Sequence, residues 1–176
     1  MASSSIISSF DHTEMLSEYQ RLADKIQWLD SPEKGQQTGV QYADGEDPFL
    51  SAVGKLQPGR IETDYNVINP LFQNTIFEDV IKKYKLYRSR LMWSSGKSCY
   101  SIHKDKSPRL HIPLITNPDC MFIFPNNPQL IHLPAGNIYA VNTLENHSFC
   151  NFSDSSRLHF MGCISVKDYG ILIKSC

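Results

Sequence analysis

No stretch of this chain approaches the roughly 18 consecutive apolar residues that a membrane-spanning helix needs. The first twelve residues, MASSSIISSFDH, contain neither a basic segment nor a long apolar core, so they do not resemble a secretory signal. These two absences predict a cytoplasmic protein that has no membrane partner.

An excess of basic residues is also missing. The chain has 17 lysines and arginines against 18 acidic residues, which gives a formal net charge of -1. A large nucleic-acid interface needs a basic surface, because the binding energy comes mainly from phosphate contacts. We therefore expect no nucleic-acid partner, although a local basic groove is not excluded by the totals.

Cysteine is scarce and irregularly placed. There is no C-x-x-C pair, the number is odd and the spacings are long, which is typical of free thiols in a reducing compartment rather than of a disulfide framework. The sequence predicts free thiols at all five positions: Cys99, Cys120, Cys150, Cys163 and Cys176.

The chain has enough material for one folded domain over residues 1–176, since it is 176 residues long and 41% hydrophobic. The apolar spacing from Met15 to Leu29 predicts a helix over residues 11–29, with Asp11 as its N-cap. Asn69-Pro70 is a typical helix start and predicts a second helix that continues to Tyr84. Residues 1–85 are thus expected to be helices and a long loop.

Residues 30–66 are rich in Gly, Asp, Gln and Pro and predict loops, with one short strand near residues 40–42. The segment 35–66 is long enough to form a lid over a binding site, and a surface loop without that role fits equally well. Two helices followed by many strands predict an α+β fold, mainly β, in which the helices buttress one sheet of an antiparallel sandwich or barrel. The expected strands after residue 85 lie in the runs LYRSRLMW, SCYSIH, RLHIPLIT, CMFIF, QLIHL, NIYAVN, HSFCNF, SRLHFMGCISV and GILIK.

His103 and Asp105 are two residues apart, so on a strand their side chains share one face. An imidazole and a carboxylate are two of the three ligands in the 2-His-1-carboxylate site that non-haem iron(II) prefers. A turn in which Asp105 caps a loop is the simpler alternative. The third ligand would be another histidine from a distant strand, with four candidates: His111, His132, His147 and His159.

Arg157 follows His147 by ten residues, and the intervening FSDSS reads as a hairpin turn that would place the two on paired strands. A guanidinium buried there would need an anion, since an unpaired buried charge is very costly. Its planar fork suits a carboxylate. In the alternative, Arg157 pairs with Asp154 or Asp168 at the surface. Arg88 and Arg90 alternate in LYRSRLMW and line either a pocket or a solvated face.

These motifs together resemble the aspartyl/asparaginyl β-hydroxylase-like family of Fe(II)- and 2-oxoglutarate-dependent oxygenases. The resemblance covers roughly residues 86–165 and rests on HKD, RLHIPL, AGNIYAVN, NHSFCN and SSRLHF in the order found in that family. It implies that residues 86–176 form a double-stranded β-helix, the jelly-roll or cupin-like core, with the N-terminal helices packed against it.

The resemblance also implies a set of roles. His103, Asp105 and His147 would bind Fe(II), and Arg157 would bind the distal carboxylate of 2-oxoglutarate. Arg109 and His111 match positions that hold the carboxylate end nearer the metal, although a structural role for both is also open. The co-reactants would be 2-oxoglutarate and O₂, and no catalytic residue beyond the metal centre is required.

One residue departs from the enzyme after which the family is named, which has Gly where this chain has Asp105. The carboxylate is more similar to related hydroxylases that act on free amino acids, including proline. We therefore expect hydroxylation of an amino acid, free or within a peptide or protein, with succinate and CO₂ as co-products. Two alternatives are a cupin-type metal enzyme that does not use 2-oxoglutarate and a non-catalytic binding protein on the same fold.

Overall fold

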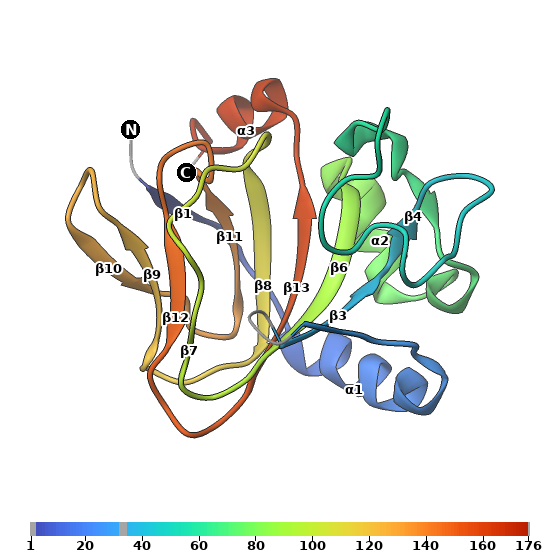
Figure 1. Ribbon diagram of the computed structural model, residues 1–176, viewed down its shortest axis with the longest axis horizontal. Helices are drawn as coiled ribbons and strands as arrows, with labels where there is room; N and C mark the ends of the chain where they lie inside the picture. Colours follow the sequence, from blue (N-terminus) through green and yellow to red (C-terminus); the bar gives the residue numbers. More distant parts are fainter. Residues whose placement is uncertain (1–2, 32–34, 176) are drawn as a thin grey trace.

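The computed structural model describes residues 3–31 and 35–175, and two antiparallel sheets facing one another dominate it (Figure 1). The larger sheet has seven strands in the order β1 (Ser4–Ser9), β11 (Asn137–Val141), β8 (Arg109–Ile115), β13 (Arg157–Cys163), β6 (Tyr87–Ser94), β3 (Gly35–Gly39) and β2 (Leu29–Ser31). The smaller sheet has the order β10 (Gln129–His132), β9 (Cys120–Phe124), β12 (Ser148–Asn151) and β7 (Ser98–Cys99). This arrangement confirms the predicted jelly-roll, cupin-like fold.

The two faces of the larger sheet differ because successive side chains on a strand point to opposite sides. On β13, Leu158 and Phe160 face the helices and belong to the main hydrophobic core. Arg157 and His159, which alternate with them, line a cavity between the two sheets. A second apolar cluster, around Phe122 on β9, closes part of the space between the sheets.

Two helices cover the outer face of the larger sheet, as the sequence predicted (Figure 1). They are α1 (His12–Leu22), extended by the 3₁₀ turn η1 (Ala23–Lys25), and α2 (Ile76–Tyr84). Asp11 caps α1 by accepting a hydrogen bond from the backbone N–H of Thr13. The ring of Phe77 on α2 meets that of Phe160 on β13 edge to face, with centroids 5.6 Å apart.

Both predicted helices are shorter than expected. The first ends near Lys25, and Leu29 lies instead in β2, where it is partly exposed. The second is broken: Asn69 caps only the short 3₁₀ turn η3 (Pro70–Phe72), and the regular helix α2 starts at Ile76. The run GILIK, expected to be a strand, instead forms the end of the helix α3 (Val166–Leu172) and the turn that follows it.

The first 85 residues contribute more than helices and a loop, because β1, β2 and β3 all join the larger sheet. The predicted strand near residues 40–42 is confirmed as β4 (Gln41–Tyr42), which pairs with β5 (Val67–Ile68) in a small separate sheet. A further 3₁₀ turn, η2 (Glu62–Asp64), precedes β5. Within residues 3–31 and 35–175, no helix is both long enough and apolar enough to cross a membrane.

The expectation of five free thiols is wrong for two of them. Cys99 on β7 and Cys150 on β12 are directly paired in the register of the smaller sheet and form a disulfide, with their Cα atoms 4.1 Å apart. Sequence spacing could not reveal this pairing, because the two strands become neighbours only in the folded sandwich. Cys120 and Cys163 are free and buried, and Cys176 lies outside the described residues.

Candidate metal centre and its cavity

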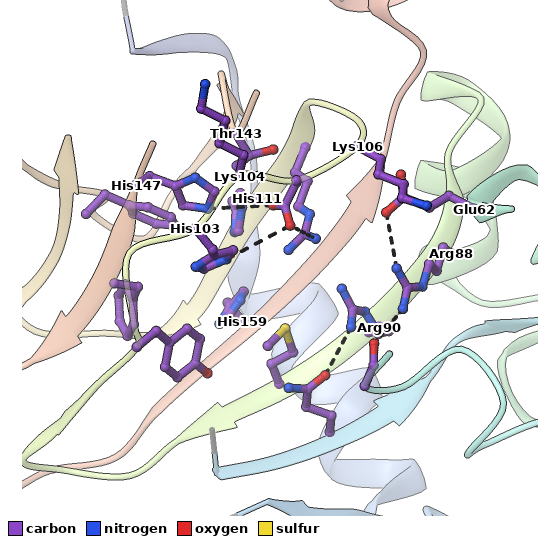
Figure 2. Close-up of a pocket in the computed structure, with 18 of the residues that line it drawn as sticks. Glu62, Arg88, Arg90, His103, Lys104, Lys106, His111, Thr143, His147 and His159 are labelled. Atoms are coloured by element: carbon purple, nitrogen blue, oxygen red, sulfur yellow. Dashed lines mark hydrogen bonds and ion pairs between the residues drawn. The ribbon is translucent and has the colours of Figure 1, made fainter. Parts of the chain in front are cut away.

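Three of the residues singled out in the sequence meet at one point. The potential ligand atoms of His103, Asp105 and His147 all lie within 4.8 Å of one another. The Nε2 atom of His147 is 3.6 Å from Oδ2 of Asp105, and that of His103 is 4.0 Å from Oδ1. Figure 2 shows the two imidazoles side by side, facing the same carboxylate. The simpler reading, in which Asp105 only caps a turn, does not describe this cluster.

Hydrogen bonds to backbone carbonyls determine which ring nitrogen of His103 and of His147 faces Asp105. Nδ1 of His103 lies 2.7 Å from the carbonyl oxygen of Ser101, and Nδ1 of His147 lies 2.9 Å from that of Glu145. Because a carbonyl oxygen only accepts, each Nδ1 atom is the donor, and in a neutral ring with this proton the Nε2 atom keeps its lone pair. Burial lowers the pKa of His147, which also favours the neutral, ligating form.

The carboxylate of Asp105 lies between the two histidines and Arg109. The guanidinium of Arg109 donates to its Oδ1 atom at 2.5 Å, while its buried Oδ2 atom has no hydrogen-bond partner among the described residues. The backbone N–H of Asp105 donates to the carbonyl of Thr143 at 2.8 Å. One carboxylate oxygen is therefore oriented by the protein, and the other is left facing the two imidazoles.

Arg157 is buried and forms no ion pair with a carboxylate of the described residues. Its side chain is 1% exposed, its Nη1 atom donates to Nδ1 of His159 at 2.6 Å, and its guanidinium lies 4.6 Å above the ring of Phe149. Its Nε atom has no partner among the described residues. The two carboxylates proposed as surface partners pair elsewhere, Asp154 with Lys97 and Asp168 with Lys85. Burial lowers the pKa of Arg157 to about 10, so it stays charged at neutral pH.

Two further histidines line the same cavity as Arg157 and the triad. His111 on β8 and His159 on β13 are both buried, with ring centroids 5.3 Å apart. Neither ring nitrogen of His111 has a partner among the described residues. Burial and the charge of Arg157 hold the pKa of both well below the usual value, so both are neutral.

A cavity of about 450 Å³ joins all six residues that the sequence assigned to the site. That volume lies in the range of roughly 300–1,000 Å³ typical of small-molecule sites. Of the four histidines considered as the third ligand, His132 does not line this cavity. Its Nδ1 atom is hydrogen-bonded to the backbone carbonyl of Cys120 on the neighbouring strand β9. The six assigned residues among those that line the cavity are His103, Asp105, Arg109, His111, His147 and Arg157.

Sequence reasoning missed the wall of the cavity opposite the triad (Figure 2). There Arg88, buried on β6 and with a left-handed φ of 52°, pairs with buried Glu62 at 3.1 Å. Arg88 also donates to the backbone carbonyls of Ala52 and Gly54, which holds the 52–62 segment against the barrel. No sequence signal could link Glu62 to Arg88, whereas the alternation of Arg88 and Arg90 had left a cavity-lining role open.

No protein-family model and no curated protein sequence matches the chain. Solved structures do match in fold. A 2OG-Fe(II) oxygenase family protein from Burkholderia pseudomallei superposes with a TM-score of 0.57 at 15% identity, covering 92% of this chain and 83% of that one. A Pseudomonas putida prolyl-4-hydroxylase gives 0.55 at 12% identity, covering 93% and 91%.

A third match is the viral collagen prolyl hydroxylase of Paramecium bursaria Chlorella virus-1, solved as a 2OG complex. It gives a TM-score of 0.53 at 11% identity and covers 92% of this chain and 95% of that one. At these identities the likeness establishes a shared fold.

Proposed function

We propose that this protein is an Fe(II)- and 2-oxoglutarate-dependent dioxygenase that hydroxylates an amino acid, free or within a peptide or protein, with succinate and CO₂ as co-products. One observation carries the proposal. A His-Asp-His cluster lines the same cavity as a buried arginine that pairs with no carboxylate of the described residues. The shared fold with 2-oxoglutarate oxygenases supports the class of enzyme.

The triad is suited to bind a metal ion because of its ligand types and because one of its oxygen atoms has no hydrogen-bond partner among the described residues. The Nε2 atoms of two imidazoles face one carboxylate oxygen that has no hydrogen-bond partner among the described residues. Two imidazoles and one carboxylate are the ligands of the facial site of non-haem Fe(II) oxygenases. The backbone carbonyls bound to both Nδ1 atoms act as the outer partners that orient such ligands. His103, Asp105 and His147 would hold the ion.

The cavity also suits a dicarboxylate. Arg157 would bind the distal carboxylate of 2-oxoglutarate, because it is charged, buried and without a carboxylate partner. Neutral His111, with both ring nitrogens free, would lie beside the co-substrate between the arginine and the triad. Arg109 would orient Asp105 and line the end of the cavity nearest the metal.

The chemistry that Fe(II) supplies in such a site is the activation of O₂ by oxidative decarboxylation of 2-oxoglutarate. The residues of this chain bind and orient the reactants and keep water out. Phe122 and Phe149 from the smaller sheet give the cavity apolar walls. The 52–62 segment, pinned by Arg88, would cover the cavity and serve as its lid.

The finer assignment rests on the motifs. The order HKD, RLHIPL, NHSFCN and SSRLHF supports membership of the aspartyl/asparaginyl β-hydroxylase-like group, and Asp105 supports an amino-acid hydroxylase within it. Two of the structures that share the fold are prolyl hydroxylases. These points favour an amino-acid substrate.

The alternative is a cupin-type metal enzyme that does not use 2-oxoglutarate. Such an enzyme has no need of a buried guanidinium in the cavity, and the unpartnered Nε atom of Arg157 speaks against it. The deciding experiment measures succinate formed from 2-oxoglutarate in air. We expect succinate only when Fe(II) is present, and none from the His103→Ala variant. Iron-bound protein that forms no succinate with any amino acid or peptide offered would favour the cupin alternative.

A further inference from the structure

A second buried guanidinium lines the cavity and is used by neither the metal centre nor the 2-oxoglutarate clamp. Arg90 on β6 is 4% exposed, and its only hydrogen bond among the described residues runs from Nη1 to Oε1 of Gln37, at 3.1 Å. Its Nε atom is buried and has no partner there. Unlike Arg88 and Arg109, Arg90 forms no ion pair with a carboxylate of the described residues.

The sheet register separates Arg90 from Arg157. Arg157 is level with Ser94 on β6, whereas Arg90 is level with Met161 on β13. The two arginines are thus four residues apart along paired strands, which is about 13 Å at roughly 3.3 Å per residue. His111 on β8 also pairs with Met161 and occupies the same row as Arg90. Arg90 therefore lies level with His111, on the wall of the cavity opposite the triad (Figure 2).

The charges around this wall do not balance. Seven arginine and lysine side chains line the cavity against two carboxylates, although the whole chain has a net charge of -1. Both carboxylates are already paired, Glu62 with Arg88 and Asp105 with Arg109. Burial, together with the charges of Arg88 and Arg109, lowers the pKa of Arg90 to about 9, so it stays charged at neutral pH. 2-Oxoglutarate would bring one carboxylate to Arg157 and one to the metal, which leaves Arg90 without an anion.

We propose that Arg90 and Gln37 form a second carboxylate subsite, which binds a carboxylate of the substrate and so restricts this enzyme to carboxylate-bearing amino acids or peptides. The proposal deepens the hydroxylase assignment and rests on it. Both side chains line the cavity. The donors are the guanidinium of Arg90, whose one hydrogen bond among the described residues uses Nη1, and the amide nitrogen of Gln37, which bonds to none of the described residues. A planar carboxylate suits a guanidinium fork and a single amide better than phosphate, which offers three oxygens and more charge.

The exposed lysines at the cavity mouth support the same substrate class. Lys55 from the 52–62 segment and Lys104 and Lys106, which flank Asp105 in sequence, all line the cavity. None of them forms an ion pair or hydrogen bond within the described residues. Clustered like charges at a cleft raise the local concentration of an oppositely charged ligand. An anionic substrate would be attracted to the mouth and then paired with Arg90.

The first arm of the test separates this subsite from the co-substrate clamp. Affinity for 2-oxoglutarate is measured by calorimetry on Mn(II)-loaded wild type, Arg157→Met and Arg90→Met. We expect Arg157→Met to lose about 10- to 100-fold, the worth of a charged hydrogen bond, and Arg90→Met to lose much less. The reverse order would make Arg90 the clamp and overturn the subsite. A wild type that binds no 2-oxoglutarate would instead contradict the hydroxylase assignment.

The second arm tests the substrate class with free amino acids and their matched carboxamides, titrated into the Mn(II) protein in the presence of 2-oxoglutarate. We expect wild type to bind one or more amino acids about 10- to 100-fold more tightly than their amides, and Arg90→Met to abolish that difference. Arg21→Met, an exposed arginine on α1, is the matched control and should keep it. The subsite is overturned if the preference survives in Arg90→Met, if no amino acid binds wild type, or if inorganic phosphate binds more tightly.

Discussion

His103 and His147 are joined by two reciprocal backbone hydrogen bonds. The N–H of His103 donates to the carbonyl of His147 at 3.0 Å, and the N–H of His147 donates to that of His103 at 2.9 Å. This isolated antiparallel bridge holds the ring centroids 4.4 Å apart. Because the bridge uses only backbone groups, the fold itself sets the positions of these two candidate ligands, and side-chain changes there should alter metal binding more than folding.

Replacing either histidine by alanine should therefore abolish metal retention while the protein stays folded. We expect His103→Ala and His147→Ala to lose more than the roughly 10- to 100-fold in affinity that follows loss of an outer partner of a metal ligand. Calorimetric titration with Mn(II) measures this, and circular dichroism checks the fold. His132→Ala, outside the cavity, is the control. Unchanged affinity in both triad variants would refute the metal centre.

Arg157→Met should separate function from stability. Arg157 pairs with no carboxylate of the described residues, so removing its buried charge relieves a desolvation cost and the apo variant should be at least as stable as wild type. The same variant should lose 2-oxoglutarate binding and keep Mn(II) binding. Chemical denaturation of the apo proteins gives the free energies of unfolding. A strong loss of stability would mean that Arg157 is a structural residue with a partner in the fold.

The effects of changing Arg88 and Glu62 on the free energy of unfolding should be strongly non-additive. Each side chain is 6% exposed, so Arg88→Met leaves a buried carboxylate without its cation and should cost about 3–5 kcal/mol. Arg88→Met/Glu62→Met should cost less than the sum of the two single changes. The more exposed pair Arg60–Glu46 is the matched control, and its loss should cost under about 1 kcal/mol. Additive effects at Arg88 and Glu62 would show that the pair does not hold the 52–62 segment.

Apo-protein stability should fall below about pH 6.5, the usual histidine pKa. Burial lowers the pKa of His111 and His159 in the folded state, so the unfolded chain takes up protons first as the pH drops. Their stabilising contribution is complete above the unfolded pKa and is lost by about 1.4 kcal/mol per pH unit per histidine below it. His159→Gln should make the dependence of the free energy of unfolding on pH less steep, by about 1.4 kcal/mol per pH unit, which can be measured by chemical denaturation at several pH values. An unchanged slope would mean that His159 is protonated in the fold.

The strands around the site could be predicted because their patterns are local. On β8 and β13, alternation placed Arg109, His111 and Arg157 on one face, and the structure brings all three to the cavity. Strand β1 escaped notice because SSIISS has no strong alternation, and its pairing with β11 is a tertiary effect. The helix α3 was mistaken for a strand because a short apolar run fits both periods.

The opposite wall of the cavity could not be predicted in the same way. Glu62 reaches Arg88 only because the 52–62 segment folds back onto β6, a contact that no spacing announces. Gln37 lies in a Gly- and Gln-rich stretch that carried no strand signal, yet β3 pairs with β6 and places it beside Arg90. The sequence shows which residues of one strand share a face. Contacts between side chains of different elements, such as Glu62 with Arg88, are known only from the folded structure.

The central claim is that the triad and Arg157 together hold Fe(II) and 2-oxoglutarate. Its most direct test is anaerobic titration of the Fe(II)-loaded protein with 2-oxoglutarate, followed by the weak visible absorption that arises when a 2-oxo acid chelates Fe(II). We expect this absorption to appear in wild type and to be absent from His103→Ala. Iron-bound wild type that shows no such absorption at saturating 2-oxoglutarate would contradict it.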